Sequence, residues 1–543
     1  MKSAAGNFIK NSYSGVEKRY RICFYSGIIC GLMAHIYALT NHLYNYDELW
    51  HTPTGFGTGV EVGRWALSVT VWLQKVLFYD CFTIPFVNGF ATIILYTLAA
   101  CFAVAVLNIN DEFYAGVTGA LMTTFPALVS RMFYMFTTHY YAIGIAMVAV
   151  GIWILVRHGK DDRKASKALF VLASAALIIF GMAIYQANFV SAVCLLVGYL
   201  LVDLIRNDYD LKNSVLKCVS YFIYLGACMA IYLLSSKLAL FITGKKMESY
   251  ENLDTMGQLS PEQLLEGLFR CYKTFLKLPF RDVYCMNPNV IVRIAFLVSI
   301  LILLYTLLKI WASDKMLHLK LLITAIVAVL PIAVNLIIIM AISSGTMYSI
   351  MVYEIVYVMV IPVACLTALS DVDKAASVAS GGWVMKAVDI VTSLALAATV
   401  IIYIWFANGN YLAMEYTNIH DNAYFTVLMA QIRSVEGYRD DMPVALIGTP
   451  SDNVTYSGRA LIDSTFAIGG KASTNIGAYS YWNIMTRVLG YDPVVRNSDE
   501  DAIYFCNHPE VIAMPVYPNS GSIKVIDDTI VIKFEDIGDN SGN

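Results

Sequence analysis

The sequence predicts an α-helical polytopic membrane protein with about eleven transmembrane helices and a C-terminal extracytoplasmic α/β domain. Hydrophobic residues make up 58% of the 543-residue chain and charged residues only 14%, whereas about a quarter of a soluble protein is charged. Continuous apolar runs, many of about 18 residues or more, recur between residues 20 and 407, and each is long enough to cross the hydrocarbon core as a helix. Their side chains do not alternate in polarity, which excludes a transmembrane barrel.

The first apolar run, residues 21–40, is expected to cross the membrane outward. It follows the basic residues Lys18, Arg19 and Arg21, which the positive-inside rule retains in the cytoplasm. No small-residue cleavage site of a secretory signal is evident in this segment. We therefore expect a multi-pass protein of the cytoplasmic (inner) membrane with a cytoplasmic N-terminus.

Residues 64–79 determine the topology of all later spans. The segment is short for a span and carries Gln74 and Lys75 near its centre, so we expect an amphipathic helix lying flat in the outer interface. With that assignment the basic segment 157–167 falls on the cytoplasmic side, as the positive-inside rule requires. If residues 64–79 crossed the membrane, the same segment would fall outside, so the flat orientation is favoured.

The remaining long apolar runs give the other expected spans. The outer loop 243–288 is expected to hold a second surface helix, because Ser260 suits the cap position and Pro261 the first turn. All of these segments belong to a predicted transmembrane domain, residues 1–407. The later spans are expected at residues 83–107, 115–130, 140–156, 168–186, 189–205, 218–242, 289–312, 321–342, 349–369 and 387–407.

From residue 408 onward apolar runs shorten and polar and small residues become more frequent, which predicts a separate extracytoplasmic α/β domain at 408–543. About 130 residues are enough for such a domain to fold alone. The expected elements are a hairpin around Asp527-Asp528 within residues 521–534, a buried strand at 443–448, and helices at 412–436 and 479–490.

The loop after the first span contains the candidate catalytic residues, Asp47 and Glu48. Paired carboxylates beside a bilayer are costly unless they have a function, because each is a charge near a low-dielectric medium. A transfer from a lipid-phosphate sugar needs a carboxylate to take the proton of the acceptor hydroxyl, and cations to stabilise the departing phosphate. The predicted topology places both kinds of residue on the outer face.

Polar and aromatic residues in the expected outer segments are candidate substrate ligands. Arginine is favoured for phosphate because its planar fork donates paired hydrogen bonds, and tyrosines with an amide suit a sugar. The candidates are Glu61, Arg64, Arg131, His139, Tyr140, Tyr185, Gln186 and Arg270.

Structural roles compete with these assignments. The acidic pair is also compatible with a solvated turn, Arg131 with a side chain that extends to the interface, and His139 with an interfacial histidine. Glu61 also fits a structural position at the start of the next helix. The functional interpretation is favoured because all these residues fall on one face in the predicted topology.

The order of these features resembles the first third of the GT-C superfamily of polyprenyl-phosphate-sugar-dependent glycosyltransferases: one span, a loop with DE, a flat helix with WLQK, two spans, then FPALVSRMFYMFTTHYYA (125–142). Four motifs are similar to the bacterial Gtr type II glucosyltransferase family, and together they extend over nearly the whole chain. They are NHLYNYDEL (41–49), GRWAL (63–67), YQAN (185–188) and CNHPEVIAMPVYPNSGSIKVIDDTIVIKF (506–534).

The resemblance implies a GT-C-like catalytic domain that moves a hexose, glucose in this family, from undecaprenyl-phosphate-glucose to a cell-surface polysaccharide. It places Asp47 at the catalytic position and implies direct displacement with inversion. Many relatives have paired aspartates there, so the Asp-Glu pair of this chain leaves open which residue is the base.

The residues also bear on cofactors, other partners and other functions. No cofactor is required, although Asp47 and Glu48 could hold Mg²⁺ or Mn²⁺ together with substrate phosphate. No basic patch indicates a nucleic acid, and no glycine-rich loop indicates a nucleotide-sugar donor. A transporter or flippase of lipid-linked sugars would show internal repeats and mid-membrane charges. The sequence has no evident repeat and few charges within the expected spans, among them Glu354 and Asp389 near span ends. A non-catalytic envelope assembly protein is the third alternative.

Overall fold

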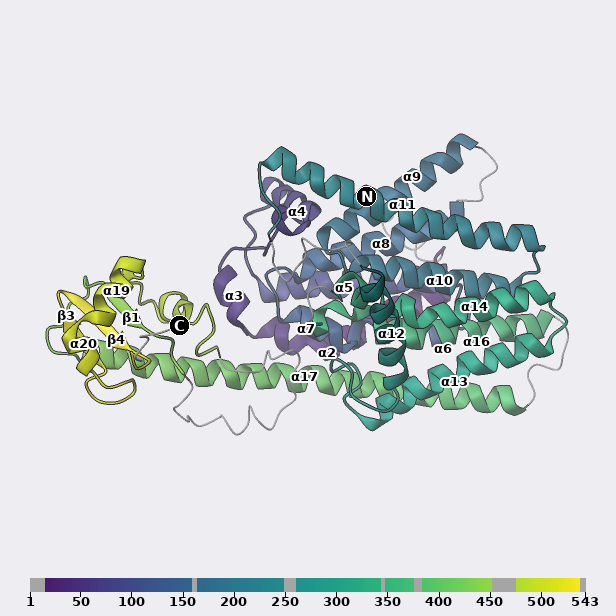
Figure 1. The fold of residues 1–543 in the computed structure, drawn as a ribbon. Helices are drawn as coiled ribbons and strands as arrows, with labels where there is room; N and C mark the ends of the chain where they lie inside the picture. The colour runs from purple at the N-terminus through teal and green to yellow at the C-terminus, as the bar shows by residue number, and fades with distance from the viewer. Residues whose placement is uncertain are drawn as a thin grey trace, which may run out of the picture. The chain divides into compact units, whose positions relative to one another are not determined.

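The structure is a computed structural model of the chain, and it describes residues 15–158, 164–248, 260–342, 347–375, 383–451 and 475–537. The centre of the predicted basic segment, residues 159–163, lies outside the described residues. The chain forms two compact units, which Figure 1 shows as ribbons. The first contains Met1–Asn41 and Thr54–Asn408, and the second contains His42–Pro53 and Gly409–Asn543.

Within the described residues, 10 helices are long and apolar enough to cross a membrane, which confirms the predicted polytopic helical fold. A further span, giving up to 11, forms if α6 (Glu112–Thr124) and α7 (Pro126–Met132) count as one, with a bend of 41° between them. The bend lies at Phe125, because a residue before proline avoids the helical conformation. The ten are α2 (Lys18–Thr40), α5 (Pro85–Val106), α8 (Thr138–His158), α9 (Lys164–Ile184), α10 (Asn188–Arg206), α11 (Leu211–Thr243), α13 (Val290–Ala312), α14 (Leu317–Val334), α16 (Tyr357–Ala375) and α17 (Trp383–Arg433).

Shorter helices connect the long ones in the first unit. The predicted surface helix forms as α12 (Pro261–Lys277), and Ser260 and Gln263 make a reciprocal capping box at its start. The segment predicted to lie flat forms α4 (Trp65–Leu77), with Trp72 exposed. The others are α15 (Leu336–Met340), η1 (Val60–Val62), η4 (Ser349–Met351) and η5 (Tyr353–Val356).

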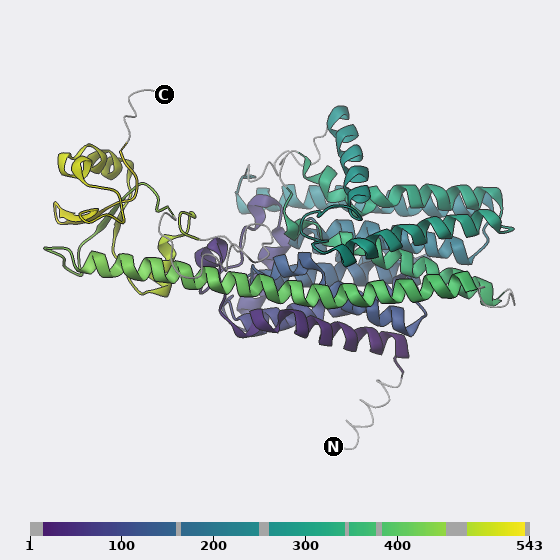
Figure 2. The ribbon, with the colours of Figure 1, turned by 90° about the horizontal axis from the view of Figure 1, so that it is seen from below.

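Small residues let the N-terminal helices of the first unit approach closely. A Cβ at Gly27 of α2 would lie 2.8 Å from Thr97 of α5, and a side chain at Gly119 of α6 would overlap the Cys23 carbonyl. Such contacts hold membrane helices together by van der Waals packing, since lipid offers no hydrophobic driving force. Figure 2 shows α2 beside α17, and in this unit the Asn408 Nδ2 donates to the Met33 carbonyl at 3.0 Å.

The turns predicted to be cytoplasmic meet at one end of the first unit. Asp371 accepts a hydrogen bond from Asn110 at 2.8 Å and forms an ion pair with Arg206 at 2.7 Å. Lys315 forms an ion pair with Asp208 at 2.7 Å. Four segments far apart in the chain therefore share one end of the helices, which agrees with the predicted alternation of spans.

The second unit contains a four-stranded mixed sheet in the order β2-β1-β4-β3. β1 pairs in parallel with β2 and β4, and β3 and β4 form the predicted hairpin. Asp527 and Asp528 take φ values of 48° and 55°, as a two-residue hairpin turn requires. The strands are β1 (Val444–Ile447), β2 (Val495–Arg496), β3 (Ile523–Ile526) and β4 (Thr529–Lys533), and the unit also holds α3 (Tyr46–His51), α19 (Asp499–Asn507), α20 (Pro509–Ala513) and the π-helical turn η6 (Ile484–Val488).

Two predicted elements differ from the structure. The span 387–407 and the helix 412–436 are one continuous helix of 51 residues, α17. A lone Gly409 costs only about 1 kcal/mol in a helix, and the side chain of Asn408 bonds back to the Ile404 carbonyl at 2.8 Å. The segment 479–490 forms turns and η6 rather than a regular helix, and ends, as predicted, at Gly490 with φ 69°.

Candidate active site

Two arginines of the first unit lie over one tyrosine ring. Tyr185 occupies the turn between α9 and α10, and the guanidinium carbon of Arg64 lies 5.1 Å from its ring centre. The guanidinium carbon of Arg131, from α7, lies 5.5 Å from the same centre. The π face of an aromatic ring attracts a cation, most strongly where water is excluded. Three predicted substrate ligands are thus brought together from distant segments.

Arg131 is fully buried, with 0% of its surface exposed. Its Nε donates to the Ile350 carbonyl at 3.2 Å, and its Nη1 donates to the Tyr96 hydroxyl. Its guanidinium carbon also lies 5.0 Å from the centre of the Tyr353 ring. The Nη2 atom has no hydrogen-bond partner among the described residues. A buried donor without a partner is costly, so this atom is a candidate ligand for an anion.

A second buried charge, Glu354 of η5, lies in the same part of the unit. Its Oε1 accepts a hydrogen bond from the Ser191 hydroxyl at 2.8 Å, and its exposed fraction is 0%. Its Oε2 has no partner in the described part of the chain. Glu354 and Arg131 lie within electrostatic range of each other. The sequence signal for Glu354 was a carboxylate beside a long apolar run, which marks a functional candidate in membrane proteins.

Arg64 lies in a set of polar and aromatic partners. Its Nε donates to the Gln186 Oε1 at 3.4 Å, and its Nη1 donates to the hydroxyls of Tyr141 and Thr58, both at 3.3 Å. Tyr141 stacks on Tyr185 with 4.4 Å between ring centres and 22° between planes. The tyrosine that joins this cluster is therefore Tyr141, next to the predicted Tyr140.

The backbone before Arg64 is held in place by two side chains. The Gln186 Nε2 donates to the Val62 carbonyl at 2.6 Å, and the Tyr232 hydroxyl donates to the Gly63 carbonyl at 3.2 Å. Gly63 takes φ 78°, which glycine adopts without strain. These contacts fix the direction in which the chain enters α4.

Glu61 forms an ion pair with Lys245 on the segment that follows α11. Burial raises the pKa of Glu61, but the hydrogen bond and charge of Lys245 outweigh this effect, and the pKa lies below its ordinary value. Glu61 is therefore ionised at neutral pH. The contact links two segments that were both predicted to lie outside.

The remaining candidates of the first unit make different contacts. The Tyr140 hydroxyl donates to the Gln74 Oε1 at 2.7 Å, and the His139 Nε2 lies 3.4 Å from the same oxygen. Arg270 lies on α12, where its ionic partner is Glu266 at 3.8 Å. The described contacts do not connect these three candidates to the ring of Tyr185.

The acid loop of the second unit, residues 42–53, holds Asp47 and Glu48 in α3. The Asn45 side chain caps this helix by accepting hydrogen bonds from the backbone N–H groups of Asp47 and Glu48, both at 2.9 Å. Asp47 is half-buried, whereas only 1% of Glu48 is exposed. The Asp47 Oδ1 accepts a hydrogen bond from the Tyr479 hydroxyl at 2.6 Å. Asp47 is therefore the more accessible of the two acids.

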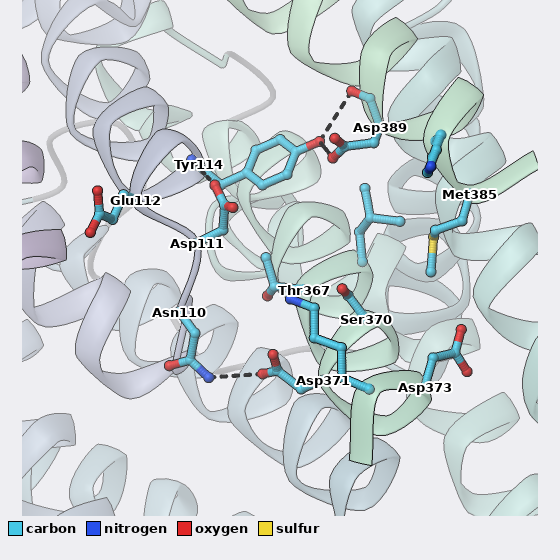
Figure 3. Close-up of a pocket in the computed structure, with 13 residues that line it drawn as sticks. Asn110, Asp111, Glu112, Tyr114, Thr367, Ser370, Asp371, Asp373, Met385 and Asp389 are labelled. Carbon is cyan, nitrogen blue, oxygen red and sulfur yellow. Dashed lines mark hydrogen bonds between the residues drawn. The ribbon is translucent and has the colours of Figure 1, made fainter. Parts of the chain in front are cut away.

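A cavity of about 550 Å³ lies at the end of the first unit opposite the cluster around Tyr185. It is lined by the start of α6, the end of α16 and the start of α17 (Figure 3). Figure 3 shows the Tyr114 hydroxyl directed at Asp389, to whose Oδ1 it donates at 2.5 Å. Asp371, which lines this cavity, and Glu354 lie roughly 25 Å apart along the helix, at a rise of about 1.5 Å per residue. The cavity therefore holds none of the candidate residues.

No three metal-binding side chains come together in the described ranges of the chain. A cation at Asp47 and Glu48 would need most of its oxygen ligands from substrate and water, as Mg²⁺ commonly has.

The fold and the cluster define a multi-pass membrane protein with buried charges of the kind that mark ligand or substrate sites in membranes. The family model Glucosyl transferase GtrII matches residues 36–367, which is more than half of the chain. The chain belongs to this GtrII glucosyl transferase family, which confirms the resemblance seen in its motifs, and it is a membrane glycosyltransferase. No curated protein and no solved structure matches it.

Proposed function

We propose that this glycosyltransferase moves glucose from undecaprenyl-phosphate-glucose to a polysaccharide of the cell surface, on the outer side of the cytoplasmic membrane. The observation that carries the proposal is the pair of arginines over Tyr185, one of which has a buried Nη2 without a partner among the described residues. A phosphate bearing a sugar is an anion with several acceptor oxygens, which matches these donors.

Arg64 and Arg131 have the role of phosphate ligands in this proposal. Their positive charges stabilise the phosphate as it departs with its extra negative charge. The hydroxyl of Tyr141 and the amide of Gln186 already bond Arg64, at 3.3 and 3.4 Å. They would orient this arginine and offer hydrogen bonds to the sugar.

Asp47 has the role of general base, because it is half-buried while Glu48 is almost fully buried. The acceptor hydroxyl gives its proton to the Asp47 carboxylate while its oxygen forms the new bond to the anomeric carbon. The bond from that carbon to the phosphate oxygen breaks, and the phosphate keeps the electron pair. One displacement from the opposite side inverts the anomeric configuration.

Mass analysis of surface glycans tests the proposal. Cells that express the chain should add one hexose to each repeat of the polymer, and cells without it should not. Asp47→Asn should abolish the addition at unchanged protein level, since the base is lost but the shape is kept. Asp80→Asn is the matched control, because Asp80 is an acid in an exposed ion pair with Lys75 and should retain activity. An active Asp47→Asn enzyme would contradict the assigned base.

The donor and the side of the membrane are tested separately. Purified enzyme should use polyprenyl-phosphate-glucose and not a nucleotide-glucose; transfer from the nucleotide alone would overturn the proposed donor. A topology reporter inserted after Lys160 should respond on the cytoplasmic side. A response from the outer side would overturn the proposed orientation.

A further inference from the structure

The C-terminal part of the chain reaches the acid loop. Asp47 accepts a hydrogen bond from Tyr479, which lies 432 positions away in the sequence. The family model ends at residue 367, so Tyr479 belongs to a part of the chain that the match does not include. This contact lies within the second unit, which contains both the acid loop and the C-terminal residues.

The helix that carries the acids cannot be stable by itself. α3 has 6 residues, and isolated helices shorter than about 12 residues are marginal in water. Its last carbonyls are bonded by two side chains. The Arg487 Nη1 donates to the carbonyls of Leu49 at 2.6 Å, Trp50 at 2.7 Å and Thr52, and the Asn483 Nδ2 donates to the Leu49 carbonyl at 3.2 Å. A cation at the C-terminal end of a helix also complements the helix dipole. Arg487 therefore holds the end of the acid helix.

The first half of the loop is also attached to the C-terminal part of the chain. The Ser480 hydroxyl donates to the Tyr46 carbonyl at 2.5 Å, and the Tyr479 ring lies 5.8 Å from the ring of Tyr46. Asn418 of α17 accepts from the Tyr44 N–H at 3.0 Å and donates to its carbonyl at 2.7 Å. Both ends of the acid helix are thus fixed by residues beyond the matched region.

The hydrogen bond from Tyr479 affects the chemistry of the carboxylate directly. A hydroxyl that donates to a carboxylate at 2.6 Å makes a charge-assisted hydrogen bond. It occupies Oδ1 and fixes the rotation of the carboxyl group. In the proposed mechanism, the Oδ2 takes the proton of the acceptor hydroxyl.

We infer that Tyr479 is a positioning residue for the catalytic carboxylate of Asp47, and that Arg487 holds the helix that presents it. The inference rests on the proposed role of Asp47 as the base. It assigns a part in catalysis to C-terminal residues of the second unit, the unit that also contains the acid loop. The sugar chemistry would then depend on residues that the family match does not contain.

Tyr479→Phe tests the positioning role because it removes the hydroxyl and keeps the ring contacts with Tyr46 and Trp50. We expect kcat to fall by about 10- to 100-fold, since small misplacements of a catalytic group have effects of this size. KM for the lipid-linked donor should stay unchanged.

The matched control is Tyr504→Phe, which removes another tyrosine hydroxyl that donates to an aspartate, Asp527, in the same unit. This variant should keep the wild-type kcat and KM. Arg487→Met should lower kcat in the same way as Tyr479→Phe, whereas Arg439→Met, which breaks exposed ion pairs with Asp441 and Asp528, should not.

The outcomes separate this inference from the proposed function. If Asp47→Asn is inactive while Tyr479→Phe retains the kcat of the wild type, the positioning role is wrong and the assigned base stands. If Asp47→Asn is active, the proposed base is wrong whatever the Tyr479 variant does. If Tyr479→Phe lowers the unfolding temperature and raises the donor KM as much as it lowers kcat, the hydroxyl has a merely structural role and the inference is overturned.

Discussion

The guanidinium carbon of Arg131 lies 5.5 Å from the centre of the Tyr185 ring, and the guanidinium carbon of Arg64 lies 5.1 Å from the same centre. One aromatic side chain thus holds two like charges in one small region. Like charges repel, and the repulsion is strongest where water is excluded. An anion between or beside them removes this repulsion, so the arrangement favours a bound phosphate.

Replacing either arginine by lysine should lower kcat/KM for the lipid-linked donor. Arg131→Lys keeps a positive charge but removes the planar fork that bonds Tyr96 and the Ile350 carbonyl. We expect kcat/KM for polyprenyl-phosphate-glucose to fall by about 100-fold, the cost of losing a charge-stabilising donor. Arg64→Lys should lower it less, because Arg64 is only partly buried. Initial rates at varied donor concentration measure both effects.

Arg293→Lys is a control for these substitutions. The Arg293 Nε donates to the Asn287 carbonyl at 3.1 Å. The described contacts of Arg293 do not include Tyr185. Its kcat/KM should match the wild type. Wild-type kinetics in Arg131→Lys would show that the buried guanidinium does not bind the donor phosphate.

The charge of Glu354 should stabilise the fold through Arg131. Glu354→Leu removes the carboxylate and leaves Arg131 buried without an opposite charge, which costs about 3–5 kcal/mol when a buried pair is broken. The double variant with Arg131→Met should be less destabilised than the single one, because no unpaired charge remains. Thermal unfolding in detergent measures the difference. If the two substitutions have additive effects, the charges do not interact.

The spans and several local elements could be predicted from the sequence because their signals are local. Apolar runs fixed the helices, Ser260 and Pro261 located the start of α12, and Asp527-Asp528 located the hairpin. These features depend on a few neighbouring residues, and hydropathy or turn chemistry determines them. The continuity of α17 could not be predicted because residues 408–410 resemble a turn, whereas the Asn408 side chain bonds within the helix.

The contacts of the candidate site could be predicted only in part. The predicted alternation of spans brought Arg64, Arg131 and Tyr185 to one face, and the structure places them around one ring. The pairing of Asp47 with Tyr479 joins positions 432 residues apart, and no periodicity or motif encodes such a contact. The sequence shows Glu354 as a charged residue near a span end, but its proximity to Arg131 follows only from tertiary packing.

The stability of the protein should fall in mild acid because of His51. Burial lowers the pKa of His51 below its ordinary value, Arg487 acts in the same direction, and Asp47 opposes them. The unfolded chain then takes up the proton at higher pH, near 6.5, than the folded protein. Stability is therefore unaffected by this group above about pH 7 and decreases as the pH falls below about 6.5.

His51→Gln should weaken this dependence. Unfolding temperatures between about pH 5 and pH 8 should vary less in the variant than in the wild type, because the group that takes up the proton on unfolding is gone. Measurements at constant ionic strength keep the neighbouring charges of Asp47 and Arg487 comparable. The same slope in both proteins would show that His51 does not contribute.

Gly63 should be sensitive to the addition of a single methyl group. It has φ 78°, and a Cβ there would lie 2.8 Å from the Tyr232 hydroxyl and 3.3 Å from the Gln186 Nε2. Gly63→Ala should destabilise the protein by about 1–2 kcal/mol through the left-handed conformation alone. It should also displace Gln186 and thereby Arg64, so the KM for the lipid-linked donor should rise.

Gly226 provides the comparison for this last substitution. It lies inside α11, and a Cβ there would meet nothing within 4 Å. Gly226→Ala should raise stability by about 0.5–1 kcal/mol, because alanine loses less conformational freedom in a helix than glycine. Its donor KM should equal that of the wild type. Both changes add one methyl group. A rise in KM confined to Gly63→Ala, together with opposite effects of the two variants on stability, would link the backbone before Arg64 to donor binding. Equal effects of the two variants on stability and on KM would refute that link.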